Sequence, residues 1–158
     1  MTSDKVLREQ VQFLLRADDA HASFDAATAD VPVGVRGQRP QGAQHSPWEI
    51  LEHLRIAQWD ILEYTRDPKH VSPEFPSGYW PASPTPPNEA AWDKSVEGFR
   101  KDLAAFSQII ADEGTDLTAP IPHTDGKTLL RQALLLADHN AYHLGELVLL
   151  RRVLGAWK

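Results

Sequence analysis

Hydrophobic residues recur at helical spacing in four long segments of this chain. In the first of them, Leu7, Val11 and Leu14 return every three to four positions, with Val6 beside Leu7. The predicted helices cover residues 3–29, 46–66, 88–113 and 128–155. Because no segment shows the strict alternation of apolar and polar residues that is typical of a strand, the pattern predicts an all-α fold.

The start of the second predicted helix carries the clearest local signal. Ser46 is a typical N-cap residue, Pro47 suits the first helical position, and Glu49 stands three residues after the serine. Such a pair forms a capping box, in which each side chain accepts a hydrogen bond from the other residue's backbone N–H. We therefore expect this helix to begin at Pro47 and to end near Arg66.

The connection over residues 67–87 holds seven of the twelve prolines, so it cannot continue a helix. At roughly 3 Å per residue in extended form, it is long enough to run the length of a bundle. The second and third helices would then point the same way, in a four-helix bundle with one long crossover. The alternative is a flexible loop that says nothing about the relative direction of the two helices. Phe75, Tyr79 and Trp80 favour an ordered strap packed along the bundle, because disordered linkers are poor in aromatic residues.

Size, charge and composition narrow the class of protein. A chain of 158 residues is predicted to form a single domain over residues 1–158. The net charge of −6 argues against a nucleic-acid partner or an anionic membrane surface. The absence of cysteine excludes disulfides, thiolate metal sites and cysteine nucleophiles. With neither a signal-peptide pattern nor an apolar run of membrane-spanning length, we expect a cytoplasmic protein.

Two histidines stand one helical turn apart in the fourth predicted helix. His139 and His143 share one face, and apolar neighbours indicate that this face points inward. A third histidine, His53, lies in the second helix, and facing helices of a bundle can bring all three together. Three neutral imidazoles with an open coordination position suit Zn²⁺ or Ni²⁺. The alternative is an accidental pair of solvated or hydrogen-bonded side chains.

A di-iron carboxylate centre, the main competing metal site of helical bundles, is excluded by the neighbouring residues. Such a centre needs Glu three positions before a histidine on two helices. Those positions hold Ile50, Leu136 and Asn140.

Several other polar residues lie near the predicted site. Glu146 shares the face of the histidine pair and could orient a ligand, act as a general base or lie at the rim; the rim is favoured. Asp60 and Glu49 fall near the face of His53, and either could touch the site. Asp138 and Tyr142 point elsewhere. The remaining histidines are expected to be solvated: His21, His45, His70 and His123.

Two motifs resemble the DinB-like superfamily of metalloenzymes. They are His45-Ser-Pro-Trp-Glu-Ile-Leu-Glu-His53-Leu and Asp138-His-Asn-Ala-Tyr-His143-Leu-Gly-Glu146, and the likeness spans essentially the whole chain. The resemblance implies an up-down-down-up four-helix bundle and a divalent metal, commonly zinc or nickel, held by His53, His139 and His143. It also implies a homodimer, and activities that include transfer reactions of low-molecular-weight thiols.

The sequence therefore predicts a divalent-metal-binding protein with three candidate functions. The first is a metal-dependent thiol S-transferase acting on a small molecule, in which the metal deprotonates a thiol. The second is a metal-dependent hydrolase that activates water, with Glu146 or Asp60 as the base. The third is a non-catalytic stress-response protein with a structural metal. The chain offers no basic cluster for an anionic thiol cofactor.

Overall fold

The computed structural model describes residues 3–16 and 19–157 of the chain. Its helices are α1 (Ser3–Arg16), α2 (Phe24–Thr28), α3 (Pro47–Arg66), α4 (Glu89–Ala111) and α5 (Leu129–Val153). Two short 3₁₀ helices cover Val33–Val35 and Ser77–Tyr79. Since the described residues form no strand, the all-α prediction is confirmed. None of the described helices combines the length and the hydrophobicity that crossing a membrane requires.

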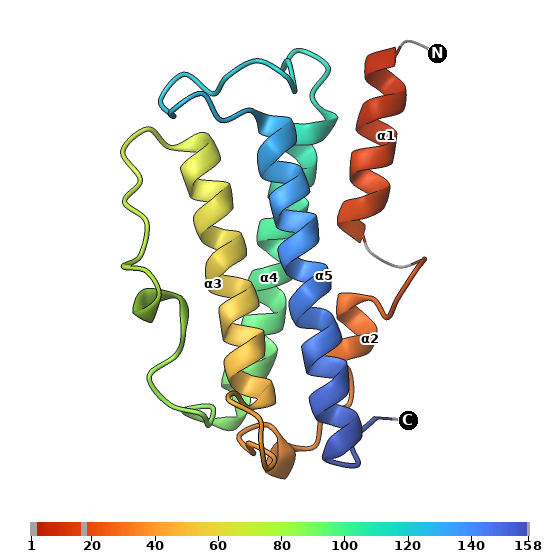
Figure 1. Ribbon diagram of the computed structural model, residues 1–158, viewed down its shortest axis with the longest axis vertical. Coiled ribbons are helices and arrows are strands. Elements are labelled where there is room, and N and C mark those ends of the chain that lie inside the picture. The colour runs from red at the N-terminus through yellow and green to blue at the C-terminus, as the bar shows by residue number, and fades with distance from the viewer. Residues whose placement is uncertain (1–2, 17–18, 158) are drawn as a thin grey trace.

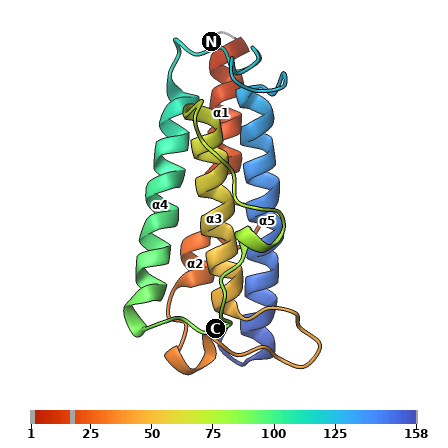
Figure 2. The same cartoon turned by 90° about the vertical axis from the view of Figure 1, so that its left-hand side faces the viewer.

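The four long helices lie side by side (Figure 1), with α3 packed against α4 and α5, and α1 against the same two helices. In Figure 1, α3 and α4 run upward while α1 and α5 run downward. The connection between α3 and α4 returns along the outside of α3, and Figure 2 shows it crossing that helix. This long connection is what allows two consecutive long helices to share one direction.

The first predicted helix is wrong in its extent. α1 ends at Arg16, and α2 is a separate helix that begins at Phe24; residues 17–18 lie outside the described part of the chain. The Ser23 hydroxyl accepts a hydrogen bond from the Ala26 N–H at 3.2 Å, which caps the new helix. A capping serine competes with continued helix because its side chain satisfies a backbone donor at a helix start.

The other predicted helix starts are confirmed. Glu49 N–H donates to the Ser46 hydroxyl at 3.2 Å, and Ser46 N–H donates to the Glu49 carboxylate at 2.8 Å, so the capping box is complete. Thr128 caps α5 by accepting from the Arg131 N–H at 3.1 Å. These caps set where α3 and α5 begin, and thereby the height at which their histidines lie.

A buried polar link separates two halves of the hydrophobic core. One half gathers around Trp92 and Phe99, the other around Phe106 and Leu136. Between them the fully buried Gln58 of α3 donates to the backbone carbonyl of Phe99 in α4 at 2.6 Å. Asn140 of α5 donates to the Gln58 side-chain oxygen at 3.1 Å. One amide therefore ties three helices together beside the predicted metal ligands.

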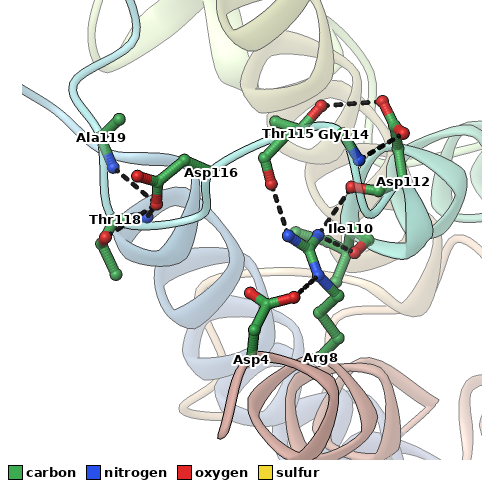
Figure 3. Close-up of polar contacts among 9 residues, drawn as sticks. All are labelled: Asp4, Arg8, Ile110, Asp112, Gly114, Thr115, Asp116, Thr118 and Ala119. Atoms are coloured by element: carbon green, nitrogen blue, oxygen red, sulfur yellow. Dashed lines mark hydrogen bonds and ion pairs between the residues drawn. The ribbon is translucent and has the colours of Figure 1, made fainter. Parts of the chain in front are cut away.

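Arg8 fastens α1 to the end of α4 (Figure 3). Its guanidinium donates to the carbonyls of Ile110 at 2.8 Å, Asp112 at 2.9 Å and Thr115 at 2.5 Å, and to the Asp4 carboxylate at 2.7 Å. The last carbonyls of a helix have no partner within the helix, and Arg8 satisfies that of Ile110 together with two carbonyls that follow α4.

We expect Arg8→Ala to lower the free energy of unfolding by about 3 kcal/mol, because one buried and two partly buried carbonyls lose a charged donor. Urea denaturation measures this change. Lys94→Ala, at an exposed position of α4, is the control and should change stability by less than about 0.5 kcal/mol. Equal unfolding midpoints for Arg8→Ala and the wild type would contradict this account of how α1 is held.

Candidate metal centre

The three predicted histidines meet in the structure. His53 projects from the middle of α3, and His139 and His143 project from successive turns of α5. The Nε2 atom of His53 lies 3.0 Å from Nε2 of His139 and 3.1 Å from Nε2 of His143. Two nitrogens bound to one tetrahedral Zn²⁺ at about 2.05 Å would lie about 3.3 Å apart, so the arrangement is close to that of a ligand set.

Two of the three rings are oriented by partners on their outer nitrogen. His53 Nδ1–H donates to the Tyr79 carbonyl at 2.9 Å, and His143 Nδ1–H donates to the Glu146 carboxylate at 3.0 Å. Because a neutral imidazole carries one proton, both Nε2 atoms then present a lone pair to the centre. Such outer partners are typical of histidines that bind metal. Nδ1 of His139 is buried and has no hydrogen-bond partner among the described protein atoms.

Burial keeps the three imidazoles neutral. Removal from water, together with the neighbouring imidazoles, lowers the pKa of His139 and of His143 to about 4. Burial also lowers the pKa of His53, although its hydrogen bond to the Tyr79 carbonyl opposes this effect. At neutral pH Nε2 of His53 and Nε2 of His143 therefore direct lone pairs at each other across 3.1 Å. A divalent cation among them would turn this repulsion into coordination, so the residues fit a metal.

Three histidines of the described residues form the candidate ligand group. Among the described residues, no carboxylate or further imidazole joins the three Nε2 atoms. Glu146, expected at the rim, instead bonds the outer nitrogen of His143, which lies on the opposite side of the ring from Nε2. It therefore orients a histidine and does not complete a coordination shell. A three-ligand site leaves a position for water or a substrate, as catalytic zinc sites do.

Asp60 anchors the connection between α3 and α4. One carboxylate oxygen accepts from His70 Nε2–H at 2.7 Å, and the other accepts from the Tyr79 hydroxyl at 2.7 Å. Burial and this carboxylate raise the pKa of Tyr79 to about 12. The backbone carbonyl of the same tyrosine holds His53, so Asp60 supports the metal centre through Tyr79. With both oxygens engaged, Asp60 is not the free base that the hydrolase hypothesis considered.

Three sequence-based expectations about neighbouring residues are wrong. The His70 side chain is only 8% exposed, because it bonds Asp60. Phe75 does not pack along the bundle, since it is 85% exposed. Glu49 does not reach the histidines; its carboxylate serves the capping box and Arg39. His21 and His123 are exposed, as expected.

Trp80 forms a stack that the sequence did not reveal. Its ring lies 3.9 Å from that of His53 on one face and 3.8 Å from that of His45 on the other, both nearly parallel. His45, expected to be solvated, is thus partly buried, and its Nδ1 lies 3.6 Å from a Glu146 oxygen. The tryptophan shields one face of a candidate ligand from water.

A hollow of about 530 Å³ opens beside the histidines. It is lined by residues 40–45, by Trp80, and by Tyr142, His143, Glu146, Leu149, Leu150 and Val153 of α5. A molecule in this hollow can therefore contact His143, whereas His53 and His139 do not line it. Asp138 and Tyr142 are both exposed, as expected of residues that point elsewhere, and the ring of Tyr142 lies 4.9 Å from that of His143.

Comparison with known families gives one result. The family described as the DinB superfamily matches residues 16–147. This range includes all three histidines, Glu146 and the connection between α3 and α4. No curated protein and no solved structure matches the chain.

Removal of the Asp60 carboxylate should release the connection. We expect Asp60→Ala to raise the rate of limited proteolysis within residues 67–87 about tenfold or more, because two charge-assisted hydrogen bonds are lost. Mass spectrometry of the fragments locates the cuts. Glu74→Gln, at an exposed position of the same segment, is the matched control and should be cut at the wild-type rate. Unchanged cleavage of Asp60→Ala would show that other contacts hold the connection.

Proposed function

We propose that this chain, which belongs to the DinB superfamily, binds one divalent metal ion through Nε2 of His53, His139 and His143. The sequence-based resemblance to that family is confirmed by a match over residues 16–147. The convergence of three Nε2 atoms, two of them with their lone pairs aimed by an outer hydrogen bond, is the observation that carries the proposal. Zn²⁺ and Ni²⁺ are the proposed ions, because imidazole nitrogen suits both.

We further propose that the protein is an enzyme that transfers a thiol sulfur to a small electrophile. When bound, the ion would supply a Lewis acid that lowers the pKa of a thiol at the open position. In the reaction, the sulfur forms a bond to an electrophilic carbon and the leaving group departs with its bonding electron pair. The thiol proton passes to solvent through the hollow.

Residues of this chain prepare that chemistry in three ways. Tyr79 and Glu146 hold two rings in one orientation, so that little reorganisation is needed when a ligand binds. Trp80 covers the face of His53 and keeps water from it. The hollow beside His143 gives a small molecule access.

Hydrolysis by an activated water is the second candidate. Glu146 supports it, because this carboxylate lines the hollow and one of its oxygens is engaged only by His45, at 3.6 Å. It could therefore accept a proton from water. Asp60 plays no part in this alternative, because both of its oxygens are bonded.

We also assign the long helices the up-down-down-up order that the resemblance implies. The parallel course of α3 and α4 in Figure 1, opposite to that of α1 and α5, supports this order.

Elemental analysis tests metal binding. We expect about one Zn²⁺ or Ni²⁺ per chain in the wild type, and loss of most of it in His143→Ala, because one of three ligands is gone. His21→Ala replaces an exposed histidine and should keep full occupancy. Circular dichroism checks that each variant folds. Full occupancy in a folded His143→Ala variant would contradict the assignment of this ligand.

Reaction chemistry is tested with Co²⁺ as a reporter ion. Addition of a small uncharged thiol to the Co²⁺-loaded protein should produce a sulfur-to-cobalt charge-transfer band, since the three histidines leave a position open. The His139→Ala variant should not show the band. Bound cobalt without a band at saturating thiol would overturn the transferase proposal while leaving metal binding intact.

A further inference from the structure

The hollow beside the histidines has the size of a small-molecule site. Its volume of about 530 Å³ lies within the range of roughly 300–1,000 Å³ that such sites occupy. Its lining follows α5 from Tyr142 to Val153, a distance of about 16 Å at the helical rise of 1.5 Å per residue. A ligand whose reactive end lies at His143 therefore has its remaining part laid along α5.

The wall along α5 is apolar and exposed. Leu149 is 59% exposed, Val153 62% and Tyr142 72%, and all three line the hollow. Large apolar side chains that border one hollow together gain free energy when an apolar molecule covers them. The far part of the ligand is therefore expected to be hydrocarbon in character.

The charge of the lining disfavours an anionic body. Among the described residues around the hollow there is no lysine or arginine, and Glu146 is the one carboxylate. A carboxylate or phosphate on the far part of a ligand would lose its hydration without gaining a cationic partner. The reactive end differs, because there the metal would neutralise a thiolate.

We propose that this hollow binds thiols with an uncharged apolar body, the sulfur toward His143 and the body against Tyr142, Leu149 and Val153. This inference rests on the proposed metal-dependent function and names its substrate class. It distinguishes this chain's site from one built for a thiol that carries carboxylates, which would require basic residues in the wall.

A matched pair of probes tests the proposal. Hexane-1-thiol and 6-mercaptohexanoate differ only at the end far from sulfur, so their thiol groups ionise alike. Each is titrated into the Co²⁺-loaded protein, and the charge-transfer band gives its dissociation constant. We expect the uncharged thiol to bind at least about tenfold more tightly, as the burial of some 50–60 Å² of apolar surface would produce.

Two substitutions at Leu149 test where the body of the ligand binds. Leu149→Glu should weaken hexane-1-thiol about tenfold without changing cobalt content, because a charge then faces the apolar chain. Leu149→Lys should tighten 6-mercaptohexanoate relative to the wild type, because it supplies the missing cation. Leu134→Glu and Leu134→Lys are matched controls: Leu134 lies on the same helix, is 47% exposed and does not line the hollow. They should bind both thiols as the wild type does.

The outcomes separate this inference from the function on which it rests. If neither thiol gives a band, the proposed thiol chemistry fails. If both give a band with equal dissociation constants, or if the Leu149 variants behave like the Leu134 variants, thiol binding stands and the apolar hollow is not where the body of the ligand lies. Tighter binding of hexane-1-thiol, together with the reversal in Leu149→Lys, supports the inference.

Discussion

Three buried imidazoles whose Nε2 atoms converge impose the central constraint on this protein. The Nε2 atoms lie 3.0 and 3.1 Å apart in the interior, where burial keeps the rings neutral. The Nε2 lone pairs of His53 and His143 face each other, which is unfavourable unless a cation joins the rings. The surrounding structure holds this arrangement in place: Tyr79 and Glu146 orient two rings, Trp80 covers one, and the Gln58–Asn140 link fixes α3, α4 and α5 at the same level.

The long connection between α3 and α4 is part of the site. Two consecutive long helices that run in one direction need a return segment, and here that segment passes the middle of α3. This segment carries the Tyr79 carbonyl and the Trp80 ring, which both contact His53. Asp60 on α3 holds the segment in place by accepting hydrogen bonds from His70 and Tyr79. Bundle topology and histidine orientation therefore have a common structural cause.

The sequence predicts what depends on neighbours along the chain and misses what depends on distant partners. The capping box at Ser46 and the one-turn spacing of His139 and His143 are local, and both are read correctly. The apolar spacing predicts one helix over residues 3–29 and does not show that a separate helix begins at Phe24, although the cap at Ser23 is a local signal. The hydrogen bond of His70 to Asp60 and the stacking of His45 on Trp80 join segments whose approach no local pattern encodes, so the sequence predicts both histidines to be solvated.

Nuclear magnetic resonance of the histidine ring nitrogens tests the central claim most directly. In metal-free protein near neutral pH, His53 and His143 should carry their proton on Nδ1, because each donates it to a protein acceptor. Addition of Zn²⁺ should shift the Nε2 resonances of His53, His139 and His143 together and saturate at one equivalent. A proton on Nε2 of His53 or His143 in the metal-free protein, or Nε2 resonances that do not respond to zinc, would contradict the account.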